Sequence, residues 1–244
     1  MQNIKKACLF QPYMHSATAL LEKLRAYPSF STNDFAKLVG GKPTYPKIFL
    51  HRLVKRKLVK RIMRGRYTTQ EDPLTFASTL LPPSYLALWS ALKFHNMTEQ
   101  IPRGYFVLTP RKRAVMMFEN EAIRINSTRL FWGFGKTTYK GFTVFVSDPE
   151  KTLIDCICSS AVSAGAVVDA MHLREINEDK LVNYAMRTAS PTLAKRIGFL
   201  MEKAGLNAVK LRNIVDYNYV PLEPKGPKTG TKNKAWHLIE NTKV

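Results

Sequence analysis

The stretch FSTNDFAKLVGGKPTYPKIFLHRLVKRKLVKRIMRGRYTT, from Phe30 to Thr69, decides how the amino-terminal third of the chain folds. No acidic residue occurs between Asp34 and Glu71. Apolar residues are interleaved with basic ones at helical spacing, so the stretch is not a disordered basic tail. Its basic residues are Lys37, Lys42, Lys47, Arg52, Lys55, Arg56, Lys57, Lys60, Arg61, Arg64 and Arg66. We therefore expect a folded surface that lies against a polyanion.

Two helices are predicted in this stretch. Ser31 or Thr32 can cap a short first helix, which Gly40-Gly41 ends. A second helix is expected over residues 46–57, where proline is tolerated in the first turn. Its inner side carries Phe49, Leu50, Leu53 and Val54 at a spacing of 3.6 residues. Its outer side carries Thr44, Lys47, Ile48, His51, Arg52 and Lys55. The second helix thus has an apolar inner face and a cationic outer face.

A basic hairpin is predicted over residues 59–69, with its turn at Met63-Arg64-Gly65. A helix over residues 14–26, stopped by Pro28, is expected to pack behind the other two. This order is typical of a winged helix-turn-helix, in which the second helix of the pair enters the major groove of DNA. A basic amphipathic helix alone is more often a solvated face. The prediction therefore depends on the turn, the acid-free composition and the hairpin together.

The predicted DNA-binding residues come from the second helix and the hairpin. The groove is expected to receive Lys47, His51, Arg52 and Lys55, with Thr44 and Tyr45 at the start of the helix. The hairpin is expected to hold phosphate through Lys60, Arg61, Arg64 and Arg66. Lys42 and Arg56 complete the predicted set.

Composition limits the function classes. The chain has 244 residues and a formal net charge of +20, which favours an acidic partner. Residues 1–72 hold 15 Lys and Arg against 4 Asp and Glu, a net of +11, and the remaining residues hold 23 against 14, a net of +9. Cys8, Cys156 and Cys158 form no disulfide framework, and we expect buried thiols in a reducing compartment. No apolar run approaches the ~20 residues that span a bilayer, and no signal peptide is evident, so we expect a cytoplasmic protein without membrane contact.

A second, mixed α/β domain is predicted from residue 73, after the break at Glu71-Asp72-Pro73. It is expected to begin with helices over residues 74–81 and 85–95, the second capped by Ser84. Strands are expected over residues 105–109, 122–125, 128–132 and 142–146. Asp148, or Ser147 with Glu150, can cap the following helix. Further helices are expected over residues 164–171, 179–187 and 191–204.

The expected domains are residues 1–72, residues 73–222 and a basic loop and tail over residues 223–244. The apolar segment around Trp236 is expected to dock back onto the second domain. The overall class is therefore α+β, with a small sheet and a helical carboxyl-terminal part in the second domain. Basic residues continue beyond residue 72, where they can extend a DNA-binding track, meet a protein partner or form a solvated surface. They include Arg111, Lys112, Arg113, Arg124, Arg129, Lys136, Lys140, Lys225, Lys228, Lys232 and Lys234.

The chain resembles a known family over nearly its whole length, and the resemblance rests on four segments. They are LVKRKLVKRIMRGRYTT (residues 53–69), PPSYLALWSALKFHNMTEQIP (82–102), VSDPEKTLIDCI (146–157) and the ending W-x-L-x-x-N (236–241). In this order and spacing the chain resembles the AbiEi-type antitoxins, transcriptional regulators of type IV toxin–antitoxin systems. Each segment alone is weakly specific.

The resemblance implies a fold and a function. It implies a winged-helix domain followed by an antitoxin domain, repression of the protein's own two-gene operon through inverted repeats in the promoter, and opposition to a nucleotidyltransferase-like toxin without a stable complex. It also implies that residues 1–72 bind DNA and that residues 73–244 neutralise the toxin.

An enzyme is the first alternative, and the sequence disfavours it. A restriction-type nuclease needs a carboxylate followed by Glu-x-Lys on a strand to hold Mg²⁺. Of the two Glu-x-Lys sequences, Glu178-Asp179-Lys180 opens a predicted helix and Glu223-Pro224-Lys225 falls in the predicted loop, and Asp148-Pro149-Glu150-Lys151 has the wrong spacing. There is no phosphate-binding G-x-x-x-x-G-K-[ST] motif and no H-E-x-x-H motif. The histidines are dispersed, so we expect no catalytic residues, no metal and no cofactor.

Two further alternatives remain open. One is a sequence-specific transcriptional regulator without a toxin partner. The other is an RNA-binding protein, which a charge of +20 would also suit. The predicted winged-helix order favours duplex DNA over RNA.

Overall fold

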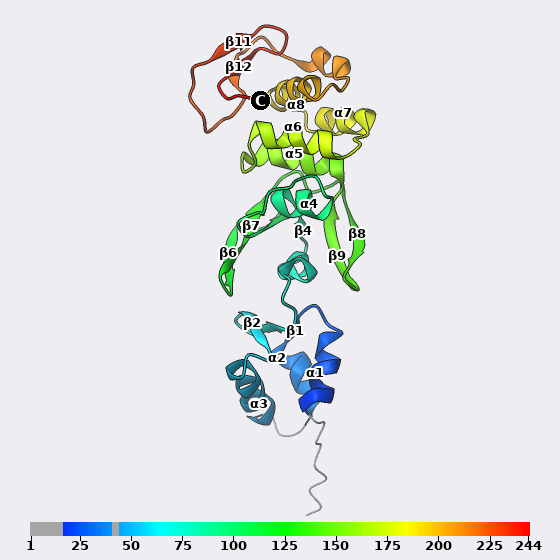
Figure 1. The fold of residues 1–244 in the computed structure, drawn as a ribbon, viewed down its shortest axis with the longest axis vertical. Coiled ribbons are helices and arrows are strands. Elements are labelled where there is room, and N and C mark those ends of the chain that lie inside the picture. The colour runs from blue at the N-terminus through cyan, green and yellow to red at the C-terminus, as the bar shows by residue number, and fades with distance from the viewer. Residues whose placement is uncertain (1–16, 41–43) are drawn as a thin grey trace, which may run out of the picture. The chain divides into compact units, whose positions relative to one another are not determined.

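The structure of the protein, a computed structural model, describes residues 17–40 and 44–244. The chain divides into two compact units, Met1–Asp72 and Pro73–Val244, which we call the amino-terminal unit and the carboxyl-terminal unit. The fold combines helices with three separate sheets, as expected for the α+β class (Figure 1). Residues 14–16 of the first predicted helix and the predicted binding residue Lys42 lie outside the described residues.

The amino-terminal unit is built on α1 (Ala17–Arg25), α2 (Thr32–Val39) and α3 (Thr44–Lys55). A core of buried apolar side chains joins all three helices: Leu20, Leu24, Phe30, Phe35, Val39, Leu50, Leu53 and Val59. Of the two predicted caps of α2, Ser31 is the one used, because its hydroxyl accepts a 3.1 Å bond from the backbone N–H of Asp34. The Asp34 carboxylate in turn accepts a 2.8 Å bond from the backbone N–H of Ser31.

A three-stranded sheet of order β1-β3-β2 completes this unit, where the sequence predicted only two strands. The hairpin consists of β2 (Lys60–Met63) and β3 (Arg66–Thr68), with Gly65 at φ +75° in its turn. The unpredicted strand β1 (Phe30–Ser31) pairs with β3. Two residues are too few to leave an alternating pattern, so sequence periodicity could not reveal this strand.

The carboxyl-terminal unit contains a six-stranded sheet of order β6-β7-β5-β4-β9-β8. Figure 1 shows its two outer hairpins, β6/β7 and β8/β9, extending away from the helices. The strands are β4 (Tyr85–Leu86), β5 (Tyr105–Thr109), β6 (Ala114–Phe118), β7 (Glu121–Ser127), β8 (Phe134–Tyr139) and β9 (Phe142–Ser147). The predicted strands at residues 105–109, 122–125 and 142–146 are confirmed, and each of their ends lies within two residues of the predicted one.

Three predictions for this unit fail in whole or in part. Residues 74–81 form two 3-10 turns, η1 (Pro73–Thr75) and η2 (Ala77–Thr79), because hydroxyls bond the local backbone in place of a helix. The predicted helix at 85–95 begins only at Leu88, as α4 (Leu88–Phe94), because Tyr85 and Leu86 pair with strands on both sides. Its predicted cap, Ser84, donates to the Ser78 carbonyl at 2.9 Å.

Residues 128–132 form a loop where a strand was predicted. The pairing of β5 with β7 stops at Thr109 and Ser127, and the chain then leaves the sheet while Leu130 and Phe131 pack on the core. The outer strands β6 and β8 were missed. β8 contains Gly135 and Lys136, which depress strand propensity, although an edge strand tolerates them.

A helical layer follows the sheet: α5 (Pro149–Ser159), α6 (Ala164–Leu173), α7 (Glu178–Arg187) and α8 (Pro191–Lys203). Asp148 caps α5 by accepting a 2.8 Å hydrogen bond from the Lys151 N–H. Of the two predicted caps of this helix, Asp148 is therefore the one used, and Ser147 is not. Cys156 is buried, whereas Cys158, which was expected to be buried, is exposed. Their two-residue spacing puts them on different sides of α5.

The end of the chain forms a small sheet of order β10-β12-β11, after the 3-10 segment η3 (Val209–Ile214). Its strands are β10 (Val220–Pro221), β11 (Thr231–Asn233) and β12 (Leu238–Glu240). Trp236 between β11 and β12 is fully buried in the main core of the carboxyl-terminal unit. The indole N–H donates a 2.6 Å bond to Glu202 of α8.

Candidate nucleic-acid interface

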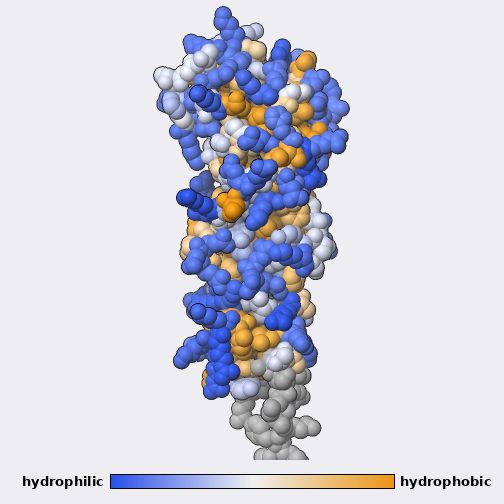
Figure 2. Space-filling view, viewed as in Figure 1, coloured by the Kyte–Doolittle hydropathy of each residue, from blue (hydrophilic) through white to orange (hydrophobic). Residues whose placement is uncertain are grey.

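The outer face of α3 carries most of the predicted binding residues. Its inner face is fixed by Leu50 and Leu53, which are at most 3 % exposed. The outer residues are all exposed: Thr44, Tyr45, Lys47, Ile48, His51, Arg52 and Lys55. Figure 2 shows hydrophilic side chains in blue beside an apolar patch in orange on the amino-terminal unit. The cations of α3 are thus held on a rigid helix by an apolar anchor on its opposite side.

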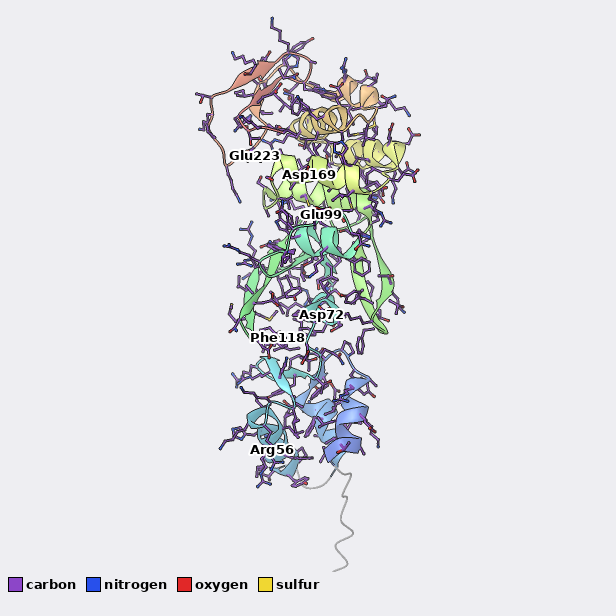
Figure 3. The ribbon with its side chains drawn as sticks, in the orientation of Figure 1. Arg56, Asp72, Glu99, Phe118, Asp169 and Glu223 are labelled. Atoms are coloured by element: carbon purple, nitrogen blue, oxygen red, sulfur yellow. The ribbon has the colours of Figure 1, made fainter. Side chains whose placement is uncertain are left out.

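The carboxyl end of α3 is closed by a left-handed residue. Lys57 has φ +58°, its N–H donates to the Val54 carbonyl, and the N–H of Leu58 donates to the Leu53 carbonyl. This is the Schellman arrangement that ends many helices. Figure 3 shows Arg56 at this end of α3. Lys55, Arg56 and Lys57 follow Val54 directly. These three cations lie at the carboxyl end of α3, where they stabilise the negative end of the helix dipole.

Hydrogen bonds at its turn and beyond its last strand fasten the hairpin to the helices. The buried hydroxyl of Thr68 donates to the Pro28 carbonyl at 2.8 Å, and the side-chain amide of Gln70 donates to the Arg25 carbonyl at 3.0 Å. In the turn, the Gly65 carbonyl accepts a 3.2 Å bond from the Thr32 N–H. Both ends of the hairpin are therefore positioned relative to α1 and α2.

A hollow of about 430 Å³ lies between α3 and the hairpin. Four predicted residues meet there, two from each side: Lys47 and His51 from α3, and Arg61 and Arg64 from the hairpin. The remaining lining residues are Thr32, Leu50, Val54, Gly65 and Tyr67. Sequence reasoning missed Thr32 and Tyr67, whose places depend on the unpredicted pairing of β1 with β3.

The other predicted cations differ in their surroundings. Arg52, Lys55 and Arg56 are exposed on α3 or just after it, outside the hollow. Lys60 is half-buried, and its Nζ lies 4.0 Å from a carboxylate oxygen of Glu71. Arg66 is half-buried on β3 opposite Ser31.

The acidic side chains of this unit leave the α3 face positive. Residues 1–72 contain Glu22, Asp34, Glu71 and Asp72 as their only carboxylates. Hydrogen bonds from the backbone and side chain of Ser31 lower the pKa of Asp34, so this carboxylate stays ionised within the α2 cap. The residues that line the hollow include three cations and one imidazole, and none of them is a carboxylate. The arrangement can bind a polyanion by charge and by hydrogen bonds from Arg and Lys.

The carboxyl-terminal unit holds a buried polar cluster of three side chains. Lys151 and Asp155 form an ion pair, the Tyr85 hydroxyl donates to Asp155 at 3.0 Å, and the Lys151 ammonium donates to Tyr85 at 3.1 Å. Each of the three side chains is at most 2 % exposed. Burial raises the pKa of Asp155 to about 6. The cluster joins β4 to α5, and its burial excludes contact with a substrate.

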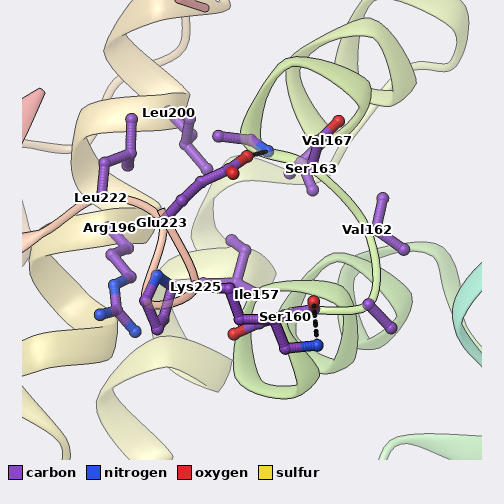
Figure 4. A pocket seen from close by; sticks show the side chains of 13 residues that line it. Ile157, Ser160, Val162, Ser163, Val167, Arg196, Leu200, Leu222, Glu223 and Lys225 are labelled. Carbon is purple, nitrogen blue, oxygen red and sulfur yellow. Dashed lines mark hydrogen bonds between the residues drawn. The ribbon is translucent and has the colours of Figure 1, made fainter. Parts of the chain in front are cut away.

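A smaller hollow of about 210 Å³ lies between α8, the start of α6 and residues 222–225 (Figure 4). Its polar groups already have partners within the chain. Glu223 accepts a 2.8 Å bond from the Ala164 N–H, Lys225 donates to the Ser160 carbonyl at 3.0 Å, and Arg196 donates to the Pro221 carbonyl. These contacts dock the tail and leave little for a ligand.

Among the described residues, no group of three or more His, Cys, Asp or Glu is placed to hold a metal ion. Within the same part of the chain, every helix is too short or too polar to cross a membrane. No family model matches the sequence, and no curated protein matches it.

Proposed function

We propose that the protein is a DNA-binding antitoxin that represses its own operon and counteracts a nucleotidyltransferase-like toxin encoded beside it. In this proposal the amino-terminal unit is a winged helix-turn-helix, with α2 and α3 as the helical pair and β2/β3 as the wing. The observation that carries it is the hollow in which Lys47 and His51 of α3 face Arg61 and Arg64 of the hairpin.

The dimensions of α3 support its role as the reading helix. Twelve residues give a rod of about 18 Å, and the major groove of B-DNA, about 12 Å wide, admits one helix. Arg52 and Lys55 lie on the exposed face of this rod, where they can reach base edges or phosphates. The wing's cations then follow the adjacent backbone, as phosphate contacts that fix the orientation of the protein.

The antitoxin role is supported by the sequence resemblance in residues 82–102, 146–157 and 236–241. These segments supply β4, α4, α5 and the docked tail. Their resemblance to AbiEi-type antitoxins assigns toxin neutralisation to the carboxyl-terminal unit. A cytoplasmic location and the absence of a cofactor are part of the same proposal.

The DNA-binding role is tested by fluorescence anisotropy with the promoter region of the protein's own gene. We expect the variant Arg52→Ala/Lys55→Ala to lose specific binding while it stays folded, because both side chains are exposed. The matched control is Lys23→Ala/Arg25→Ala, which removes the same charge from exposed positions of α1. Equal losses in both variants would mean that net charge alone, and not the α3 face, drives binding.

A structured RNA of equal length, measured at the same salt concentrations, distinguishes the RNA-binding alternative. Non-specific electrostatic affinity falls steeply with salt, whereas specific recognition leaves a preference for one sequence. Tighter binding to RNA than to the promoter would overturn the DNA-binding proposal.

The antitoxin role is tested by co-expression with the neighbouring gene. We expect the full-length Arg52→Ala/Lys55→Ala variant to rescue growth as well as the wild type when both are expressed from a foreign promoter. Absence of rescue by the wild type would leave the simpler function, a transcriptional regulator without a toxin partner.

A further inference from the structure

Two tyrosines and a histidine meet beside the small sheet that ends the chain, whose strands β11 and β12 are labelled in Figure 1. The ring centroid of His237 lies 5.4 Å from that of Tyr217 and 5.4 Å from that of Tyr219. We refer to these three side chains as the aromatic cluster. Tyr217 is 89 % exposed and Tyr219 is 36 % exposed. A ring with this much exposed surface can receive a second flat ring on its face.

The register of the small sheet brings the aromatic cluster together. β10 pairs parallel with β12, with Val220 opposite Leu238. Tyr219 and His237 each directly precede one of these paired residues, so they lie side by side. His237 has φ +48°, a left-handed conformation that is uncommon outside glycine, and its carbonyl accepts a 3.2 Å bond from the Val220 N–H. The imidazole is therefore placed by a specific backbone arrangement.

A buried lysine fixes the backbone on both sides of Tyr217. Lys195 of α8 is fully buried, and its ammonium donates to the Asp216 carboxylate at 2.6 Å and to the Asn218 carbonyl. The Asp216 carboxylate also accepts a 2.9 Å bond from the Asn218 N–H. The exposed ring of Tyr217 thus extends from a backbone that is already ordered, which lowers the entropic cost of binding a ligand.

The charge beside the aromatic cluster is positive. The Nζ of Lys232, on β11, lies 5.2 Å from the centroid of the Tyr219 ring. Residues 208–244 contain seven Lys and Arg against three Asp and Glu. The three carboxylates bond to the Lys195 ammonium, to a backbone N–H and to a side-chain amide. They are, in this order, Asp216, Glu223 and Glu240.

Exposed rings beside an ammonium group match the repeating unit of a nucleic acid, because a base stacks on the ring and a phosphate pairs with the cation. In a duplex the faces of the bases are stacked on one another, so a tyrosine stacks on a base only where the base is unpaired. An apolar protein surface would cover the rings but would desolvate the ammonium of Lys232 without a partner. The arrangement therefore favours a single strand.

We propose that the aromatic cluster and Lys232 bind single-stranded nucleic acid, with Tyr217 and Tyr219 stacking on unpaired bases and Lys232 contacting phosphate. DNA and RNA strands share the base and the phosphate that these side chains contact. The site lies in the carboxyl-terminal unit and uses none of the residues proposed to bind duplex DNA, so each of the two proposals can fail without the other.

The stacking role is tested by fluorescence anisotropy of the full-length chain with labelled DNA and RNA strands of about ten nucleotides, within the usual site sizes. The strands are of mixed sequence without self-complementarity. We expect Tyr217→Ala to weaken binding about 5- to 150-fold, the loss that one stacked base gives. Tyr217→Phe keeps the ring and should bind as the wild type does. Tyr27→Ala, which removes an exposed tyrosine of the amino-terminal unit, is the matched control.

Salt dependence separates stacking from charge, because a net charge of +20 attracts any polyanion. Tyr217→Ala removes no charge, so its fold loss should persist at every salt concentration and leave the slope of log affinity against log salt unchanged. Lys232→Gln should lower that slope by about 0.7, the value for one phosphate contact on a single strand. Lys136→Gln, at an exposed position of β8, should leave the slope unchanged.

Three results would overturn the proposal. One is a wild type that binds neither strand at low salt, and another is a Tyr217→Ala variant that binds both strands as tightly as the wild type. The third is a strand affinity that falls in Arg52→Ala/Lys55→Ala and not in Tyr217→Ala, which would place single strands on α3. A loss confined to RNA or to DNA would support the site and identify the strand it takes. Promoter duplex should bind Tyr217→Ala and the wild type equally.

Discussion

The hydroxyl of Thr68, at the end of the hairpin, donates a 2.8 Å hydrogen bond to the carbonyl of Pro28, beyond the end of α1. The same oxygen accepts a 2.9 Å bond from the N–H of Gln70. Forty residues separate Thr68 from Pro28 in sequence, and the hydroxyl is inaccessible to solvent. One side chain thus holds the hairpin against the helices that carry the proposed reading surface.

Thr68→Val removes this hydroxyl and keeps the side-chain shape. It leaves two half-buried backbone groups, the Pro28 carbonyl and the Gln70 N–H, without their partner, so we expect a loss of about 1–2 kcal/mol in the free energy of unfolding. Promoter affinity should fall as well, although no cation is lost, because the wing is no longer held in position. Urea unfolding and anisotropy measure the two effects. Thr68→Ser keeps the hydroxyl, and an equal affinity loss in that control would contradict the explanation.

Arg64→Ala tests whether the wing contacts phosphate. Each phosphate contact contributes about 0.9 to the slope of log affinity against log salt for B-DNA. Arg64 lines the hollow on the hairpin side and is exposed. We expect the variant to lose about one unit of slope and to weaken binding uniformly across DNA sequences. An unchanged slope would remove Arg64 from the phosphate contacts, and Arg25→Ala on α1 is the control.

The three helices of the amino-terminal unit were predictable because each carries a local signal. Ser31 caps α2, Gly40 ends it, and the spacing of Leu50 and Leu53 identifies the buried side of α3. Exposure of the α3 cations follows from that spacing. The hollow could not be predicted from that spacing, because it depends on where the hairpin packs. The position of the hairpin is set by the pairing of Phe30 with Tyr67, which are distant in sequence.

In the carboxyl-terminal unit, the errors arose where tertiary pairing overrides local preference. Tyr85 and Leu86 continue a pattern that also suits a helix, but strands on both sides bind their backbone. Leu88 then takes φ +53°, a left-handed conformation that no helical pattern predicts for leucine. The buried Lys151 was equally unpredictable, because its ion pair with Asp155 forms beneath Tyr85 of a distant strand.

Substitutions in the Tyr85–Lys151–Asp155 cluster should have strongly non-additive effects on the free energy of unfolding. Asp155→Leu alone leaves a buried ammonium without its counter-ion, so we expect a loss of about 3–5 kcal/mol in the free energy of unfolding. The triple variant Tyr85→Phe/Lys151→Met/Asp155→Leu removes the polar groups together. We expect it to unfold within about 1 kcal/mol of the wild type. Chemical denaturation of both variants measures this, and a triple variant as unstable as the single one would contradict it.

Glu150 should make the free energy of unfolding depend on pH in the acid range. Burial raises the pKa of Glu150. The Lys180 ammonium, whose Nζ lies 2.8 Å away, and the Asn177 N–H, at 3.1 Å, together lower the pKa by more than burial raises it, so the net shift is downward. A lowered folded-state pKa gives stability that is present above the unfolded value of about 4.5 and lost as pH falls through the folded value.

Glu150→Gln should therefore cost about 1–3 kcal/mol near neutral pH, and the difference from the wild type should shrink as pH falls below about 4.5. Urea unfolding at a series of pH values measures the difference. The exposed Glu175→Gln serves as the control and should show no such trend. A difference that grows toward acid would reverse the assigned sign.

Gly198 in α8 admits the indole of Trp236 and so holds the tail. A Cβ at position 198 would lie 2.1 Å from the ring, far inside van der Waals contact. Gly198→Ala should therefore displace Trp236, break its bond to Glu202 and expose residues 225–234 to trypsin, although alanine favours the helix itself. Gly135→Ala, where a Cβ would meet no atom within 4 Å, is the matched control.

In a double-mutant cycle, Trp236→Ala removes the ring that the added methyl group would strike, so the cost of Gly198→Ala should largely disappear in that background. Denaturant unfolding gives the coupling free energy, and trypsin cleavage reports the state of the tail. Fully additive costs would mean that Gly198 acts on helix stability alone, and that the tail docks independently of the space this glycine leaves.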